Sequence, residues 1–211
     1  MIKFTKIMLL MLLFLLQGCN NGSSTMPNTI HYYLDPSKSL SQTGRIAIIE
    51  LENSSDYPAI SYDITNSLHR SLQKTQLFGI SVISKENSIW SDLKINANDK
   101  YTLEQLSEIR KTINCNAMLT GTITQYTPYP HTTVALILKL TDLRDGKLIW
   151  AMEQIFDSSD KTTEARIEKY LQAQNNTKTN TIDAKLITIS PVKFIDFVTY
   201  EVASTMIEKN K

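Results

Sequence analysis

The chain has 211 residues, a formal net charge of +1 and nearly equal numbers of basic and acidic side chains, 22 and 21. Neither sign forms a long run, so the chain lacks the concentrated basic surface that phosphate backbones require, and nucleic acid is not expected as a partner. Two cysteines, Cys19 and Cys115, allow at most one internal disulfide, and the length suits one domain with a sizeable core.

The N-terminal segment has the pattern of an export signal that ends in a cysteine. Two lysines precede an apolar run of ten residues, 7–16. A transmembrane helix takes about 20 apolar residues, so this run is too short to hold the protein as a span. The segment closes with a lipobox made of Leu16, Gln17, Gly18 and Cys19.

This segment resembles the signal peptides of bacterial lipoproteins. The resemblance implies removal of residues 1–18, a diacylglyceryl thioether on Cys19 and acylation of its amine. Each buried methylene is worth about 0.8 kcal/mol, so several acyl chains would hold the protein at a membrane almost permanently. Asn20 follows the cysteine where Asp commonly signals inner-membrane retention in Gram-negative lipoproteins. We therefore expect a lipid anchor on the periplasmic side of the outer membrane, and no other cofactor.

Composition divides the rest of the chain into three parts. Residues 19–43 are rich in Asn, Ser and Thr and read as a flexible tether. Residues 44–157 carry the strand and helix patterns of an α/β core domain, and residues 158–211 read as a helical extension packed on that core.

The core pattern predicts a mixed sheet of about five strands in the order β-α-β-α-β-β-β. The strands are expected at 45–51, 79–84, 117–126, 132–143 and 147–156. The first helix, capped from within 53–56, repeats apolar residues every four positions, and the second starts at the capping-box pair Thr102 and Gln105 with Leu103 opening its buried stripe. Gly121 within a strand predicts a close backbone approach or a bulge, and Gly146 supplies the positive φ of a hairpin turn.

The C-terminal extension has two helical patterns. Residues 158–174 predict a polar surface helix, and Ser190 followed by Pro191 marks the start of a terminal helix. Its apolar residues are Phe194, Val198, Val202 and Met206, with Ile195, Phe197 and Tyr200 beside them. We expect this broad face to pack on the sheet, with contact to a second copy of the chain as the alternative.

Known catalytic and metal-binding patterns are missing from the sequence. There is no nucleophile elbow, phosphate-binding glycine loop or paired-histidine helix motif, and His69 has no histidine at metal-ligand spacing. Glu50 and Glu52 share a strand face but have no matching base or nucleophile, and Cys115 reads as a buried, inert thiol. We expect no metal site and no enzymatic activity.

The connection after the third strand is the candidate contact with a partner. Two prolines and two tyrosines, Tyr126, Pro128, Tyr129 and Pro130, make it stiff and aromatic. Tyrosine is enriched in protein interfaces, so we identify these four residues as a candidate docking surface, with a merely rigid connection as the alternative.

Three stretches also carry a resemblance to a family. They are the strand at 45–53, the Gly-containing strand at 116–123 and the Leu-x-Asp-x-x-x-Gly-x-x-x-Trp hairpin at 138–150. Together they look like the periplasmic α/β domain shared by the curli-secretion lipoprotein, lipoprotein activators of penicillin-binding proteins, an exopolysaccharide-export lipoprotein and the N-terminal domain of the Tol-system propeller protein. Cys115 and Asn116 stand where that pattern usually has small residues. The resemblance implies a non-enzymatic domain that docks on other proteins, sometimes as a ring.

The sequence therefore predicts a membrane-anchored accessory or scaffold lipoprotein that docks an envelope protein. One alternative is a ring-forming component of a secretion or polysaccharide-export system. Another is a glycan or small-molecule binder that uses Tyr126, Tyr129 and Trp150.

Overall fold

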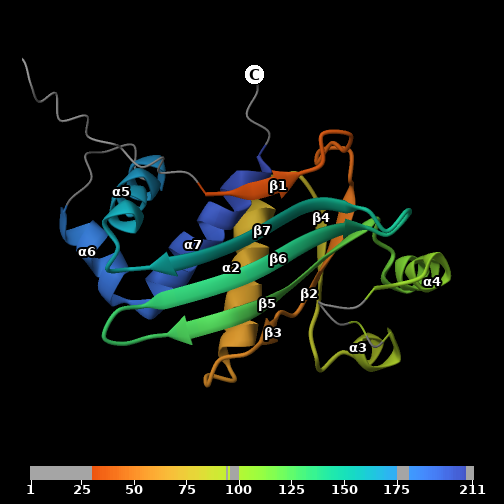
Figure 1. Cartoon of the computed structure of the whole chain (residues 1–211), viewed down its shortest axis with the longest axis horizontal. Helices are drawn as coiled ribbons and strands as arrows, with labels where there is room; N and C mark the ends of the chain where they lie inside the picture. The colour runs from red at the N-terminus through yellow and green to blue at the C-terminus, as the bar shows by residue number, and fades with distance from the viewer. Residues whose placement is uncertain (1–29, 94, 96–99, 175–180, 208–211) are drawn as a thin grey trace, which may run out of the picture.

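A computed structural model describes residues 30–93, 95, 100–174 and 181–207 (Figure 1). The predicted lipobox lies outside these residues. The described chain forms one sheet with helices packed on it, which confirms the α/β class.

The sheet has seven strands where about five were expected. Its strands are β1 (Tyr32–Leu34), β2 (Arg45–Ile49), β3 (Glu52–Asn53), β4 (Gly79–Ile83), β5 (Ala117–Thr127), β6 (Thr133–Asp142) and β7 (Leu148–Asp157). The order across the sheet is β1-β7-β6-β5-β2-β4, and β3 pairs with β5. The long strands β5, β6 and β7 are antiparallel, whereas β2 runs parallel to both β4 and β5. The two additional strands, β1 and β3, are only two or three residues long, too short for a periodic pattern to reveal them.

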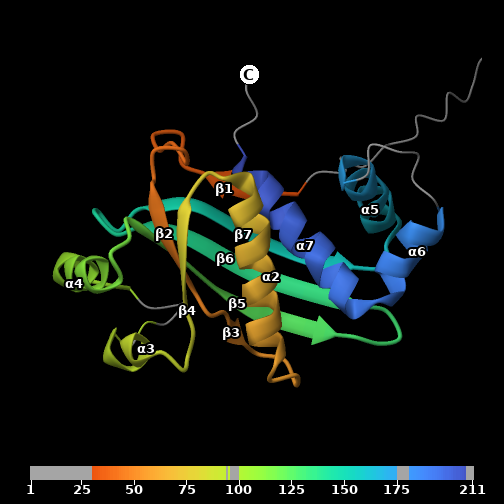
Figure 2. The ribbon, with the colours of Figure 1, turned by 180° about the vertical axis from the view of Figure 1, so that it is seen from behind.

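The helices are α2 (Ile60–Thr75), α3 (Ser88–Leu93), α4 (Leu103–Ile113), α5 (Lys161–Gln174), α6 (Thr181–Ile189) and α7 (Pro191–Met206). Helices α2 and α7 lie side by side across one face of the sheet (Figure 2). Helices α3 and α4 pack over the other face at β2, β4 and the start of β5, and no described helix covers that face of β6 and β7 (Figure 1).

The main core lies between the sheet and the α2–α7 pair. The predicted stripe of α2 is buried there, as are the four predicted residues of α7, which recur every turn from Phe194 to Met206. Trp150 and Phe156 of β7 are fully buried against them. A second core under α3 and α4 buries Cys115 and Met118.

Several local predictions are confirmed in detail. Thr102 and Gln105 form the capping box of α4, and the Ser190 hydroxyl accepts from the Lys193 amide at the start of α7. Gly146 has φ +71° in the β6–β7 turn. A Cβ atom at Gly121 would collide with the Ile137 carbonyl, which is the expected close approach, and the bulge of β5 lies further on.

Three local expectations were wrong. Residues 30–43, assigned to the tether, belong to the folded body, because β1 pairs with β7 and Leu40 is fully buried. The N-cap of α2 is Ala59 without a side-chain cap, since Asn53 instead bonds Ser55 and the Tyr57 carbonyl within the preceding turn. Leu103, expected in the buried stripe of α4, is exposed at the first turn of that helix.

Candidate functional site

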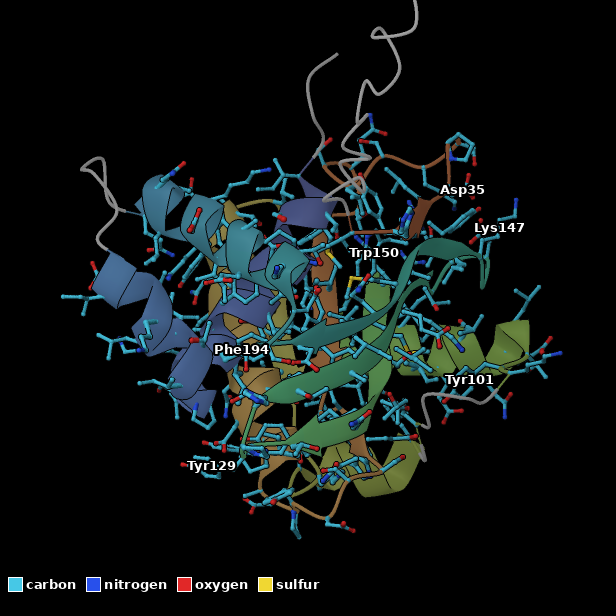
Figure 3. The ribbon with its side chains drawn as sticks, turned by 60° about the vertical axis from the view of Figure 1, so that its left-hand side comes forward. Asp35, Tyr101, Tyr129, Lys147, Trp150 and Phe194 are labelled. Atoms are coloured by element: carbon cyan, nitrogen blue, oxygen red, sulfur yellow. The ribbon has the colours of Figure 1, made fainter. Side chains whose placement is uncertain are left out.

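The predicted tyrosine–proline connection lies at the end of the sheet where β5 turns into β6. Figure 3 shows Tyr129 at the tip of this loop, with 71% of the residue exposed. The Tyr129–Pro130 peptide is cis. The loop is fixed at its end, because the Thr132 hydroxyl donates to the Pro128 carbonyl at 3.3 Å and the Thr132 amide donates to the Ser158 hydroxyl at 3.0 Å.

Tyr126 precedes that tip and is part of the sheet. It belongs to β5 and is half-buried, with its ring edge-on to Tyr57 at a centroid separation of 5.2 Å. Burial raises the pKa of the Tyr126 phenol, and the nearby carboxylate of Asp63 raises that pKa further. The hydroxyl therefore stays protonated at neutral pH and keeps its ability to donate a hydrogen bond.

A hollow of about 440 Å³ opens beside Tyr126, between α2 and the first turns of α7. We call it the tyrosine groove. Its walls are Tyr62, Asp63, Asn66, Ser67, His69, Arg70, Tyr126, Val192, Ile195 and Asp196. Tyr62 and Val192 are 63% and 70% exposed at its rim, whereas Ile195 is buried in its floor.

Polar contacts between the two helices set the width of the tyrosine groove. The Ser67 hydroxyl donates to the Asp196 carboxylate at 2.6 Å and lies 2.9 Å from the Thr199 hydroxyl. Ser71, one turn further along α2, lies 3.0 Å from the same Thr199 hydroxyl. The short side chains of Ser67, Ser71 and Thr199 allow α2 and α7 to approach closely, and the larger side chains beside them form the walls of the groove.

The charges of the tyrosine groove favour a cationic neighbour. Asp63 and Asp196 both line it, and Arg70 pairs with Asp196 at 3.2 Å. Asp63 therefore contributes a carboxylate beyond the one that Arg70 neutralises. A ligand could place an apolar side chain on Ile195 and a neighbouring Lys or Arg opposite Asp63, where the opposite charges attract.

The groups considered for catalysis are each engaged elsewhere. Glu50 accepts from the Lys85 amide at 2.9 Å, and the Glu52 carboxylate accepts from the Thr122 hydroxyl at 3.4 Å, so the two acids serve separate contacts. Burial raises the pKa of the Cys115 thiol, which disfavours the reactive thiolate. No group of three His, Cys, Asp or Glu side chains in the described ranges is arranged to hold a metal ion.

The structure places the remaining predicted site residues as follows. The lipobox residues Leu16, Gln17, Gly18 and Cys19 fall in the undescribed N-terminal part, so lipidation stays a prediction from the sequence. Trp150 is fully buried under α7, which removes it from the surface that the glycan-binding alternative required.

Of the residues that line the groove, only Tyr126 belonged to the predicted contact, and Tyr62 and Val192 show why the others were missed. Tyr62 and Val192 are exposed large side chains on the solvent side of helices whose apolar stripes were recognised. A single exposed tyrosine or valine is common on protein surfaces, so only the packing of α2 against α7 reveals that they face one another across a hollow.

Among the helices that the structure describes, none is both long and apolar enough to cross a bilayer.

Comparisons with known proteins found similarity in structure alone. No family model matches the chain, and no curated protein matches its sequence. Lipoprotein GNA1162 from Neisseria meningitidis is 17% identical with a TM-score of 0.44, over 64% of this chain and 99% of that one. The PelC dodecamer from Paraburkholderia phytofirmans is 12% identical with a TM-score of 0.44, over 65% and 88%. The LpoB C-terminal domain from Salmonella enterica is 14% identical with a TM-score of 0.39, over 57% and 85%. All three TM-scores lie below 0.5, and no statement about function follows from them.

Proposed function

We propose that this protein is a lipid-anchored envelope lipoprotein that acts without catalysis, by docking another envelope protein through the tyrosine groove and the β5–β6 loop. The observation that carries the proposal is the gathering of exposed aromatic side chains at one end of the molecule. Tyr57, Tyr62 and Tyr129 are exposed there, and Tyr126 connects them to the sheet by its contact with Tyr57.

The chemistry of this surface suits a protein ligand. Tyrosine buries a large rigid ring at a low cost in conformational entropy and keeps a hydroxyl for hydrogen bonding, so it dominates many interfaces. The rim combines these rings with Asp63 and Asn66, and the floor is Ile195. We infer that the occupant is a partner segment with one apolar anchor side chain next to a lysine or arginine.

The lipid on Cys19 would contribute by confinement. A protein held on one leaflet meets its partner at a high effective concentration, so a modest interface is sufficient for occupancy. The docking surface therefore does not need to be large, which agrees with a groove of about 440 Å³.

Site-specific photocrosslinking in living cells tests the docking surface. A photoreactive amino acid replaces Tyr62 or Tyr129 in the full-length chain. Matched controls replace Ile155 or Lys139, which alternate with buried core residues of β7 and β6 and so lie on the sheet face opposite α2 and α7. We expect one identified envelope protein to be captured from both tyrosine positions with a yield at least tenfold above the controls. We further expect Asp63→Lys to reduce the affinity of the purified pair about tenfold, because it reverses the charge that faces the partner's cation. Equal capture from the control positions would contradict the proposal.

A further inference from the structure

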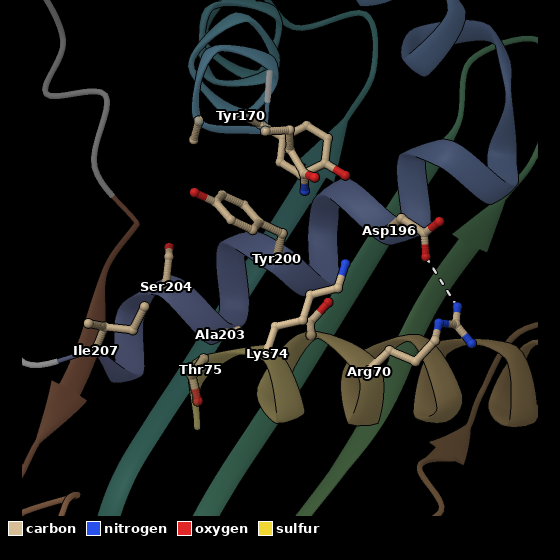
Figure 4. Close-up of a pocket in the computed structure, with 12 residues that line it drawn as sticks. Arg70, Lys74, Thr75, Tyr170, Asp196, Tyr200, Ala203, Ser204 and Ile207 are labelled. Carbon is tan, nitrogen blue, oxygen red and sulfur yellow. Dashed lines mark hydrogen bonds and ion pairs between the residues drawn. The ribbon is translucent and has the colours of Figure 1, made fainter. Parts of the chain in front are cut away.

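A second hollow lies beyond the Arg70–Asp196 ion pair, at the opposite end of the α2–α7 seam (Figure 4). It has a volume of about 370 Å³, and we call it the C-terminal pocket because the last turns of α2, α5 and α7 surround it. It shares only Arg70 and Asp196 with the tyrosine groove, and the proposed docking function does not use its other walls.

One wall of the C-terminal pocket is aromatic. Tyr170 of α5 and Tyr200 of α7 stand together there, with ring centroids 4.8 Å apart and planes inclined by 60°. Burial raises the pKa of both phenols, so both hydroxyls remain protonated and can donate hydrogen bonds. Ala203 leaves the space below the rings open, because its side chain ends at Cβ.

The opposite wall carries a positive charge. Figure 4 shows the Lys74 side chain extending from the last turn of α2 toward the two tyrosines. Of the ion pairs that the described residues form, none involves Lys74, whereas Arg70 at the border is paired with Asp196 at 3.2 Å. Lys74 therefore gives the pocket a net positive charge.

The helix ends that meet at the pocket do not reverse that sign. Carbonyl groups at a helix C-terminus carry partial negative charge and attract cations. Here the Thr75 hydroxyl donates to the Leu72 carbonyl at 2.7 Å, and the Ser204 hydroxyl donates to the Glu201 carbonyl at 2.7 Å. These bonds satisfy carbonyls of α2 and α7 and leave the full charge of the lysine as the stronger local field.

We propose that the C-terminal pocket binds an anionic saccharide, a sugar ring that bears a carboxylate or a phosphate. The C–H faces of the sugar ring would lie against Tyr170 and Tyr200, the two phenols would donate to ring hydroxyls, and the anionic group would face Lys74. A volume of about 370 Å³ lies at the small end of the range for ligand sites and suits a single sugar residue.

Titration calorimetry on the full-length chain carrying Cys19→Ser, which leaves the chain unlipidated, tests the assignment. The probes are glucuronate, glucose 6-phosphate, glucose, acetate and inorganic phosphate. We expect saturable binding of at least one of the two anionic sugars, on the order of 1 mM for a single sugar. Binding of glucose, acetate and inorganic phosphate should be at least tenfold weaker, because each lacks either the charge or the ring.

Two lysine substitutions distinguish a specific binding site from non-specific electrostatic attraction of anions. Lys74→Gln should weaken anionic-sugar binding at least tenfold without changing the melting temperature, since this lysine forms no ion pair that holds the fold. The matched control Lys139→Gln, on the far face of the sheet, should leave binding unchanged. The proposal is overturned if no anionic sugar binds, if glucose or acetate binds equally well, or if the two lysine variants behave alike. None of these outcomes bears on docking at the tyrosine groove, which the crosslinking experiment tests separately.

Discussion

The ammonium group of Lys38 lies 2.8 Å from a carboxylate oxygen of Asp142, a residue with no exposed side-chain surface. Asp142 also accepts from the Arg144 amide at 2.9 Å and from the Arg144 guanidinium at 2.9 and 2.7 Å. Lys38 follows β1, and Asp142 ends β6, so this contact fastens the start of the folded body to the β6–β7 hairpin. The chain that leads toward Cys19 thus leaves a body whose first residues are firmly held.

We predict that this cluster makes stability sensitive to acid. Burial alone would raise the pKa of Asp142, but the hydrogen bonds from Arg144 and Lys38 outweigh it and hold the pKa well below its usual range. A carboxyl group with a lowered folded-state pKa stabilises the protein above its unfolded-state pKa of about 3.9, and that stability is lost as the pH falls toward the folded-state value. Urea unfolding should therefore show a falling free energy of unfolding below about pH 4.

Substitution of the same residue gives the matching test. Asp142→Asn should lower the free energy of unfolding by about 2 kcal/mol at pH 7, because hydrogen bonds to a charged group are lost in a buried position. It should also flatten the acid dependence. Asp145→Asn is the control, since the Asp145 side chain is 37% exposed in its own pair with Lys38 and should cost less than about 1 kcal/mol. Equal losses from the two variants would contradict the assignment.

A buried ion pair joins α5 to α7 and leads to a second prediction. The guanidinium of Arg166 donates to Glu201 at 2.7 Å and lies over the rings of Phe156 and Phe197. Glu201→Ala should cost about 3 kcal/mol, because Arg166 would then be a buried charge without its carboxylate. The double variant Arg166→Met with Glu201→Met should recover most of that loss, as hydrophobic replacement of buried pairs often does. Denaturant titration of the single and double variants measures both, and a double variant no more stable than Glu201→Ala would refute the account.

Two strand glycines, Gly121 in β5 and Gly79 in β4, provide a packing test. Gly121→Ala should destabilise the fold by about 2 to 3 kcal/mol, since the new Cβ meets the Ile137 carbonyl and the Leu138 side chain. Gly79→Ala is its matched control. The nearest atom there is Cγ of the flexible Arg45 side chain at 3.1 Å, and the expected change is within about 0.5 kcal/mol. The melting temperatures of the two variants should differ clearly. Similar values would contradict the prediction, because they would mean that β6 moves aside at no cost in stability.

Some of these elements could be predicted from the sequence alone, and others could not. The long strands and α2, α4 and α7 could be predicted because their apolar residues recur with the period of the element, and the caps at Thr102 and Ser190 are local patterns. Strand β1 could not, since three residues carry no period and its position depends on pairing with β7. Burial of Arg166 was equally hidden, because a charged residue becomes part of a core only through partners that are distant in the chain.

The candidate site was predicted in part for the same reason. Tyr126 and Tyr129 were visible as an aromatic loop, but only Tyr129 lies in the exposed loop, whereas Tyr126 belongs to β5. The hollow beside Tyr126 depends on Tyr62 and Val192, which come together only when α2 packs against α7. Local patterns identify one wall of a groove, whereas the opposite wall comes from tertiary packing.

We propose that a lipid at Cys19 confines a docking surface around Tyr62, so that a high local concentration compensates for a modest affinity of the interface. The most direct measurement is the photocrosslinking yield from Tyr62 in cells that carry either the wild-type N-terminus or Cys19→Ser, at matched periplasmic amounts. We predict that loss of the lipid lowers the yield at least tenfold while the fold and its melting temperature are unchanged. An undiminished yield from the Cys19→Ser form would contradict the account.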